Sequence, residues 1–448
     1  MRFRKAVAAL VLLMLCFLLV SCERENPAIA PDEKSTDPAA EVAGREAQAV
    51  EEGVLKFRIT WKGYSGRGEA IQKIVDTYNS KFTNYSAVTL VNGDEDRAAI
   101  QTLLKQEPET VYVLPYRYVK FFGANGYLQD LTTAFATARD LFYKEVWALG
   151  TVNEKTYGIP WLGHSMCLLY NKSLLEKAGV KAESIVGMDS FLNAMEVIEK
   201  KTGAKGLGLV GAKSNDLSWM VNQFIYGFGS QLVSADGKMV AVNNEKSAEA
   251  LKLYKEMLGP HAQPTWLDDT AVEAMNAFKR QEVAFEILGI WGVTDIMKNG
   301  SPFEVGILPL KNIGLNAEVG PMMLAIPAGM SKEGKEAATQ FINYMISKDA
   351  QEEIMKGEFS PEHDAYYPFR TPIRADMADS RIFLEHPEYR AFVEGFETPS
   401  IDVPVPAWQI IKDEVYAPGL HRVMTGEMSV EAFLSDVEKK GNAILQGQ

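Results

Sequence analysis

Cysteine, histidine and basic charge are scarce in this chain of 448 residues. It has three cysteines and five histidines, and its 46 Lys and Arg residues are outnumbered by 59 Asp and Glu residues, which gives a net charge of −13. Three cysteines cannot build a disulfide framework, and an acidic chain offers little to a phosphate backbone, so we expect no nucleic-acid partner. The histidines are scattered without an H-E-x-x-H motif, so we expect no catalytic zinc and no cofactor.

Long apolar runs are also scarce, and the single one lies at the N-terminus. Three basic residues precede a run from Ala6 to Val20, which is shorter than the roughly 20 residues of a spanning helix and typical of a secretory signal. The run ends in Leu19-Val20-Ser21-Cys22, which resembles the lipobox of bacterial lipoproteins, where the cysteine is acylated after cleavage. The alternative is an ordinary signal peptide with a chance cysteine. We predict a lipoprotein signal peptide over residues 1–21 and a lipid anchor at Cys22, on the extracytoplasmic side of a cell membrane (periplasmic or outer face).

The segment after Cys22 lacks large apolar side chains. Residues 23–53 contain three prolines and many Ala, Glu and Asp residues, and such a composition buries too little surface to offset the chain entropy lost on ordering. We therefore predict that residues 22–53 form a lipidated, disordered tether.

Regular structure is predicted from residue 54 onward. Apolar residues alternate with polar ones from Leu55 to Trp61, which indicates a strand, and further strands are predicted over 88–91 and 110–114. Helices are predicted between them, over 71–82 and 96–105, where apolar residues recur every three or four positions. This order of strands and helices is typical of a parallel sheet, whose ligands bind beyond the carboxyl ends of the strands.

The same alternation of strand and helix signals continues to the C-terminus, so the fold class is α/β without internal repeats. Strands are predicted over 165–170, 283–288, 305–308 and 323–326, and helices over 190–200, 337–346 and 429–445. Ser190 or Asp189 is expected to cap the helix over 190–200. Cys167 lies in an apolar run and is interpreted as a buried core residue.

Several motifs resemble the extracellular sugar-binding proteins of ABC importers, the maltose-binding-protein-like solute-binding family 1. Tyr157-Gly158-Ile159-Pro160-Trp161, followed by Leu168-Leu169-Tyr170-Asn171-Lys172, resembles the most recognisable stretch of that family. Segments 108–111, 278–291, 323–346, 402–408 and 426–445 agree in order and spacing, although Glu109 replaces the usual Asp and no proline precedes Trp291. The resemblance covers nearly all of residues 54–448.

The resemblance implies a two-lobed, periplasmic-binding-protein-like fold of type II, with a hinge and a ligand cleft between the lobes. Carried over, the first lobe would comprise 54–117 plus 323–372 and the second 118–322 plus 373–448. It further implies that the protein is a monomer with no enzymatic activity. Its partners would be a carbohydrate ligand, most simply an oligosaccharide, the permease subunits of an ABC transporter, and the membrane through the lipid anchor.

Aromatic platforms are the first candidates for ligand contact, because the apolar face of a pyranose packs on flat rings. From their positions at strand ends and in the family motifs we predict ligand contacts at five tryptophans, and the alternative at each is core packing. They are Trp61, Trp161, Trp219, Trp291 and Trp408.

Polar candidates are residues that follow the predicted strands or interrupt apolar ones. Asp94 and Glu95 follow the second strand, and Tyr116 and Arg117 follow the third. His164 lies in a loop expected to face the cleft, and Glu286 lies within a predicted strand, where ligand contact and an internal ion pair are both open. Arg370 lies near an expected crossing between lobes and is interpreted as a ligand or hinge residue.

Three rival interpretations remain open at this point, and an enzyme is the first. Gly163-His164-Ser165-Met166-Cys167 is one residue short of the G-x-S-x-G elbow of a serine hydrolase. A different cargo on the same fold is the second. Tyr366-Tyr367 resembles the twin tyrosines of iron-binding relatives, which makes a ferric ion one alternative cargo. A peptide, a polyamine or a glycerol phosphate is another. An adhesin or chemoreceptor-partner role on the same fold is a third possibility.

Overall fold

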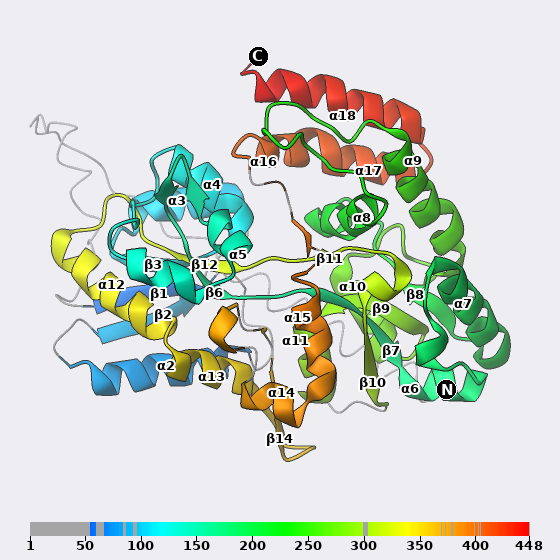
Figure 1. The fold of residues 1–448 in the computed structure, drawn as a ribbon, viewed down its shortest axis with the longest axis horizontal. Coiled ribbons are helices and arrows are strands. Elements are labelled where there is room, and N and C mark those ends of the chain that lie inside the picture. Colours follow the sequence, from blue (N-terminus) through cyan, green and yellow to red (C-terminus); the bar gives the residue numbers. More distant parts are fainter. Residues whose placement is uncertain are drawn as a thin grey trace, which may run out of the picture. The chain divides into compact units, whose positions relative to one another are not determined.

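The computed structural model describes residues 54–59, 67–83, 87–92, 96–298, 303–368, 370–371, 373–377, 380–397, 399–401, 403 and 405–447. The predicted signal peptide, Cys22 and the tether lie outside these residues, as do Trp61, Asp94 and Glu95. The described chain is α/β and contains two main sheets (Figure 1), which confirms the predicted fold class. Among the described residues, no helix has both the length and the apolar character that a membrane span requires.

The first sheet has five strands in the order β2-β1-β3-β12-β6. β1 is parallel to both β2 and β3, as predicted, whereas β12 runs antiparallel to β3 and β6. The strands are β1 (Val54–Ile59), β2 (Ala87–Asn92), β3 (Thr110–Pro115), β6 (Ile159–Leu162) and β12 (Met322–Ala325).

Helices cover both faces of the first sheet. On one face Phe57 packs edge-on against Phe341 and Trp161, within a core that also takes in apolar residues of α2 and α12. On the other face apolar residues of α3 and α4 pack against β3 and β12. The elements of this lobe outside the sheet are α2 (Arg67–Lys81), α3 (Arg97–Gln106), α4 (Tyr116–Ala124), a 3-10 turn (Ala136–Leu141), α5 (Lys144–Leu149), β4 (Thr151–Val152), β5 (Lys155–Thr156), α12 (Lys332–Met345) and α13 (Lys348–Lys356).

The second sheet has four strands in the order β10-β7-β9-β8. β7 is antiparallel to β10 and β9, and β8 is parallel to β9. Successive side chains of β7 alternate between two cores, with Met166 and Leu168 in one and Cys167 and Leu169 in the other. Cys167 is therefore a buried core residue, and burial raises the pKa of its thiol well above the ordinary value.

The second sheet and its helices occupy two stretches of the chain. The strands are β7 (Met166–Asn171), β8 (Lys205–Gly208), β9 (Val283–Gly289) and β10 (Val305–Pro309). The helices are α6 (Lys172–Ala178), α7 (Met188–Thr202), α8 (Asn215–Gly227), α9 (Glu245–Lys252), α10 (Ala271–Lys279), α11 (Ile290–Lys298), α14 (Arg381–Glu385), α15 (Arg390–Glu394), α16 (Trp408–Ile411), α17 (Ala417–Met424) and α18 (Val430–Leu445). π-helical segments at Leu253–Leu258 and Lys412–Tyr416 continue α9 and α16.

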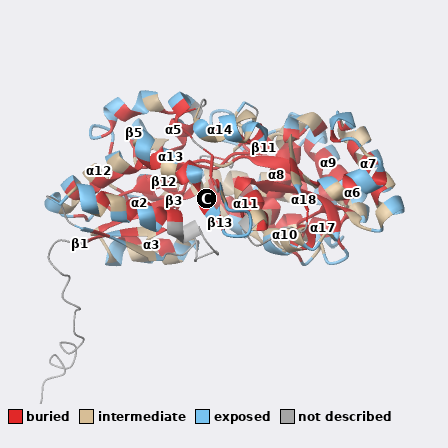
Figure 2. Cartoon of the chain, turned by 90° about the horizontal axis from the view of Figure 1, so that it is seen from below, coloured by how far each residue is buried: buried red, intermediate tan, exposed pale blue. Residues whose placement is uncertain are grey.

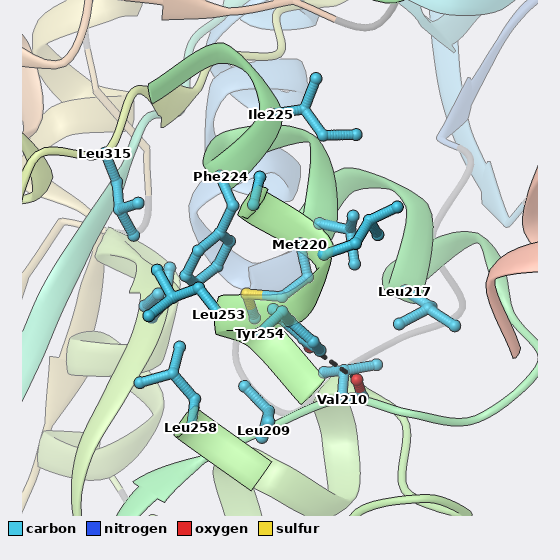
Figure 3. Close-up of a cluster of buried hydrophobic side chains, with 14 of the residues drawn as sticks. Leu209, Val210, Leu217, Met220, Phe224, Ile225, Leu253, Tyr254, Leu258 and Leu315 are labelled. Atoms are coloured by element: carbon cyan, nitrogen blue, oxygen red, sulfur yellow. Dashed lines mark hydrogen bonds between the residues drawn. The ribbon is translucent and has the colours of Figure 1, made fainter. Parts of the chain in front are cut away.

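Helix α8 anchors the larger core of the second lobe. Phe224 on α8 meets the ring of Tyr254 edge-on, with ring centres 5.1 Å apart. The hydroxyl of Tyr254 donates a hydrogen bond of 2.6 Å to the carbonyl of Val210 (Figure 3). The polar end of this buried tyrosine is thereby satisfied, so the ring can be buried without leaving an unpaired donor.

Side-chain caps explain the starts of several helices. Asn171 caps α6 by accepting the amide of Leu174, and α6 ends at Gly179 with φ +68°. The predicted cap of α7 is wrong, because the helix begins two residues earlier, after Gly187. Ser190 instead donates its hydroxyl to the carbonyl of Gly187 and accepts the amide of Val186.

The predicted lobe boundaries also need correction. Residues 131–162 contribute Leu131, Phe135, Trp147 and strand β6 to the first sheet and its core, rather than to the second lobe. Ile373 belongs to the same core, whereas Phe383 and Phe392 pack in the second lobe. We therefore define the first lobe as residues 54–162 plus 322–377 and the second lobe as 166–318 plus 380–447. Each lobe has its own buried interior (Figure 2).

Candidate functional site at the lobe crossings

Two connecting strands between the lobes lie side by side and are braced by a third segment. Gly163 and Thr371 exchange two backbone hydrogen bonds, of 3.1 and 3.0 Å. The amide of Gly320 donates to the carbonyl of His164 at 3.2 Å, and Ser165 forms a bridge with Val319. These contacts join residues that are more than 150 positions apart in the sequence, and they define the candidate site, which we call the junction.

Trp291 is the residue that contacts the most different parts of the junction. It is partly buried at the start of α11 and packs against the cores of both lobes. The ring of His164 meets the indole edge-on at 5.2 Å, and the guanidinium carbon of Arg370 lies 4.9 Å from its centre. Predicted residues Trp291 and His164 are thus brought together, and Arg370 joins them.

His164 forms a hydrogen-bonding contact with a carboxylate that the sequence did not reveal. Its Nε2 lies 2.8 Å from Oε2 of Glu318, on β11 (Ala317–Glu318). The backbone amide of Glu318 in turn donates to Oε1 of the fully buried Gln223 on α8. Nδ1 of His164 is buried and has no hydrogen-bond partner within the described residues. The junction therefore presents a histidine whose orientation is held by the carboxylate of Glu318, while the backbone of Glu318 is held by the side-chain amide oxygen of Gln223.

Tyr116 lies at the junction, with its ring close to Gly320. The amide of Tyr116 donates to the carbonyl of Pro321 at 3.1 Å. A Cβ at Gly320 would lie 2.6 Å from the His164 ring and 3.1 Å from the Tyr116 ring, so only glycine allows both rings to approach this strand. Arg117, by contrast, places its guanidinium 4.9 Å from the ring of Tyr118 on the same helix.

Two of the predicted tryptophans lie in the lobe cores. Trp161 is fully buried on β6 and packs against Phe57, while Trp408 is 1% exposed in the core of the second lobe beside Tyr416. In this structure both act as packing residues. The third, Trp219, is partly buried on α8, and its indole N–H donates to Asp216 at 3.2 Å.

Glu286 occupies the middle of β9, opposite Leu169. It is 1% exposed, and its Oε2 has no partner within the described residues. Burial raises the pKa of Glu286 well above its ordinary value, against a smaller lowering by the charge of Lys279. Among the described residues the structure brings this carboxyl into contact with no junction residue and into no ion pair within 4 Å, so the alternative prediction of an internal ion pair finds no partner there.

The features behind the rival interpretations have different surroundings. Ser165 is fully buried, and its hydroxyl donates to the neighbouring carbonyl of Met166. Tyr366 and Tyr367 are adjacent on β14 (Ala365–Tyr367) and therefore point to opposite faces of the strand. Tyr366 is 39% exposed with the ammonium of Lys356 4.3 Å from its ring, whereas Tyr367 is buried near His363 and His386. The two phenols do not converge on one ion.

Sequence reasoning missed Glu318 and Gln223. Neither residue lies at the end of a predicted strand or in a family motif, and both act through contacts between segments distant in sequence. The available signal was the pair Asn222-Gln223, which interrupts the apolar residues of 220–225, because amides within an apolar run need partners once they are buried.

The fold and the junction define a two-lobed binding protein, and comparison with known sequences names the family. Residues 73–388 match the bacterial extracellular solute-binding proteins, and the chain belongs to this family. It is 23% identical to a binding protein of Brucella abortus over 65% of this chain and 68% of that protein. It is 26% identical to the lactose-binding protein of Rhizobium radiobacter over 52% of this chain and 56% of that protein.

Solved structures support the same fold over a larger share of the chain. The GacH receptor of Streptomyces glaucescens superposes with a TM-score of 0.74 at 22% identity, covering 88% of this chain and 98% of that one. Maltose-bound MalE3 of T. maritima gives a TM-score of 0.74 at 20% identity, covering 88% and 99%. UgpB of Mycobacterium tuberculosis, in complex with glycerophosphocholine, gives 0.71 at 18%, covering 88% and 99%. The maltose-binding-protein-like fold is thus confirmed.

The protein is accordingly an extracellular solute-binding component of a transport system, as its family defines. Such a component binds a solute and passes it on without changing its bonds. The serine-hydrolase interpretation is therefore set aside on family membership as well as on the burial of Ser165.

Proposed function

We propose that the solute is a carbohydrate, most simply an oligosaccharide, and that it binds between the lobes with Trp291 as its aromatic platform. The observation that carries this proposal is the surroundings of Trp291, whose indole stands among an imidazole, a carboxylate and a guanidinium at the junction. Sugar recognition uses this combination, because a pyranose has apolar C–H faces and hydroxyls that both donate and accept hydrogen bonds. The name of the lactose-binding relative supports the same solute class.

Binding at the junction would be coupled to the angle between the lobes. The residues around Trp291 come from both lobes and from the connecting strands, so a ligand that contacts them all stabilises the closed arrangement relative to the open one. The closed form is the one expected to dock on the permease. Residues Trp61, Asp94, Glu95, Arg117 and Trp219 stay in the proposal as further contacts around the ligand.

The proposal includes the lipid anchor at Cys22 and the tether over 22–53. It rests on the basic residues, the apolar run and the lipobox-like Leu19-Val20-Ser21-Cys22. Metabolic labelling of the expressed protein with an alkyne palmitate tests it, because the wild type incorporates the label and Cys22→Ala does not. Equal labelling of both proteins would contradict the anchor.

An organic phosphate of a polyol is a second candidate solute, favoured by one observation. Arg370 is 8% exposed and places its guanidinium at the junction, and a buried guanidinium is a strong partner for phosphate.

A thermal-shift panel tests the proposed solute. A ligand that binds only the native state raises the melting temperature, with about 2.7 kcal/mol of stabilisation at a hundredfold excess over Kd. We expect a shift with one class of oligosaccharide and none with ferric citrate, peptides or polyamines. A shift with glycerol phosphates alone would favour the second candidate, and a shift with ferric citrate, peptides or polyamines alone would contradict both.

A further inference from the structure

A cavity separate from the junction lies entirely within the first lobe. Its volume is about 640 Å³, and it lies between α4, the segment 132–148 and the β4–β5 hairpin. None of the junction residues takes part in it. The side chains that matter for its chemistry are Lys120, Arg139, Lys144, Thr132, Thr156 and Glu154.

The cavity is basic in an acidic protein. Three cations, Lys120, Arg139 and Lys144, line it together with a single carboxylate, Glu154. Within the described part of the chain, none of the three cations forms an ion pair: the nearby carboxylate of Asp130 contacts Lys155 instead. A concave surface with an excess of one charge concentrates the electrostatic field, so it attracts counter-ions more strongly than a flat surface does.

Lys120 is the cation held most firmly in the cavity wall. Its neighbours on α4, Val119 and Phe122, are fully buried in the core, so the helix cannot rotate to carry the ammonium into solvent. Burial lowers the pKa of Lys120 to about 8. A partly buried ammonium without a carboxylate partner is disfavoured, and a bound anion would offset that cost.

The opposite wall of the cavity is preformed. The β4–β5 hairpin turns through Asn153 and Glu154, whose φ values of 49° and 63° are those of a tight two-residue turn. The amide of Thr156 donates to the hydroxyl of Thr132 at 2.9 Å, and the hydroxyls of Thr151 and Thr156 lie 3.3 Å apart. The Thr132 hydroxyl already donates to Asp130 at 2.6 Å, so the hydroxyls of Thr151 and Thr156 are the ones that can turn toward a ligand beside the cations.

We propose that this cavity binds an organic phosphate, with the phosphate group between Lys120, Arg139 and Lys144 and the threonine hydroxyls around it. Three cations opposed by one carboxylate suit a group of charge near −2, which a phosphomonoester carries at neutral pH. The cavity is larger than an inorganic ion needs, so the rest of the ligand also has room. The phosphate can come from a soluble metabolite or from a phospholipid headgroup, since the predicted tether would keep the protein near a membrane.

Calorimetric titration of the full chain with inorganic pyrophosphate tests the shared chemistry. We expect binding to the wild type and at least tenfold weaker binding to Lys120→Met and Arg139→Gln. The matched control is Lys439→Met, an exposed lysine on α18 of the second lobe, which should bind like the wild type. Loss of pyrophosphate binding by Arg370→Gln, with Lys120→Met unaffected, would place the binding at the junction and overturn the proposal. Equal pyrophosphate binding by Lys120→Met and the wild type would overturn the proposal.

Two further measurements make the result independent of folding and of the ligand source. In proteins with ¹³C-methylated lysines, the Lys120 resonance should titrate near pH 8 and move to higher pH when pyrophosphate is bound. Sedimentation with phosphatidic acid vesicles, whose headgroup is a phosphomonoester, compared with phosphatidylcholine vesicles, tests the headgroup. The proposal is supported if the wild type binds pyrophosphate or anionic vesicles and Lys120→Met weakens that binding, and the probe that binds identifies the source of the phosphate. Binding of the wild type to neither probe overturns it. Failure of the carbohydrate panel would leave these outcomes unchanged.

Discussion

The guanidinium carbon of Arg370 lies 4.9 Å from the centre of the Trp291 ring, and the contact joins a helix of the second lobe to the chain beside a crossing between the lobes. Trp291 opens a helix of the second lobe, whereas Arg370 precedes Thr371, which pairs with Gly163. A cation held over an aromatic face contributes about 0.5 to 2 kcal/mol, depending on how far it is desolvated. The contact therefore couples the orientation of the proposed sugar platform to the hinge.

Substitution of Arg370 by Gln distinguishes the two candidate solutes. If the solute is a neutral carbohydrate, Arg370→Gln should weaken binding by about fivefold through the lost cation–π contact, and the affinity of the wild type should not depend on salt. A loss of more than tenfold, together with an affinity that falls steeply with salt, would assign the guanidinium to a phosphate. Isothermal titration calorimetry at low and high salt measures both effects.

Trp161 should affect stability rather than affinity. Because it is fully buried against Phe57, Trp161→Ala should lower the free energy of unfolding by about 3–5 kcal/mol. Chemical denaturation followed by circular dichroism measures this change. Val186→Ala, at a side chain that is 77% exposed, is the control and should change stability by less than about 0.5 kcal/mol. A stable Trp161→Ala protein that has lost its ligand would instead place this tryptophan in the binding site.

Glu286 should make stability depend on pH in the direction opposite to most carboxylates. Its pKa in the folded protein is raised by burial, so the folded state favours the protonated carboxyl, and stability is lost as pH rises above the unfolded pKa. Glu286→Gln removes this loss. Its melting temperature should exceed that of the wild type at neutral pH and approach it near pH 4. Thermal unfolding over that pH range measures the difference, and a Gln variant less stable at neutral pH would contradict it.

Asp376 should stabilise the protein against acid. Hydrogen bonds from Arg374, of 2.9 and 2.8 Å, together with its charge and that of Lys348, lower the pKa of Asp376 to about 2. The folded state favours the charged carboxylate, so its contribution is present above about pH 4 and is lost as pH falls toward 2. The carboxylate is partly exposed, and solvent screening reduces the expected cost of Asp376→Asn at neutral pH to about 1 kcal/mol. Equal denaturation midpoints at neutral pH would refute this role.

Local patterns predicted the elements of the fold well, because periodicity and caps act over a few residues. The strand at Val283–Gly289 and the helix at Val430–Leu445, predicted over 283–288 and 429–445, illustrate this. The lobe boundary was missed because β6 pairs with β12, about 160 residues later in the sequence. All four residues of β6 are apolar, so the sequence carries no sign of which sheet they join.

The same limit applies to the candidate site. Trp161, Trp291 and Trp408 all lie in family-like motifs, yet two are buried in the lobe cores and one stands at the junction. Which tryptophan is covered depends on segments that fold over it from elsewhere, such as α12 over β6. Glu318 became visible only through its contacts with His164 and Gln223.

Calorimetric titration of Trp291→Ala beside the wild type, with the oligosaccharide that gives the largest thermal shift, tests the central claim most directly. Trp291→Phe is the matched variant that keeps an aromatic face. Trp291→Ala should bind the oligosaccharide at least tenfold more weakly than the wild type, and Trp291→Phe should lose less affinity. Both variants should still unfold cooperatively. Equal affinities for Trp291→Ala and the wild type would contradict a carbohydrate site at the junction.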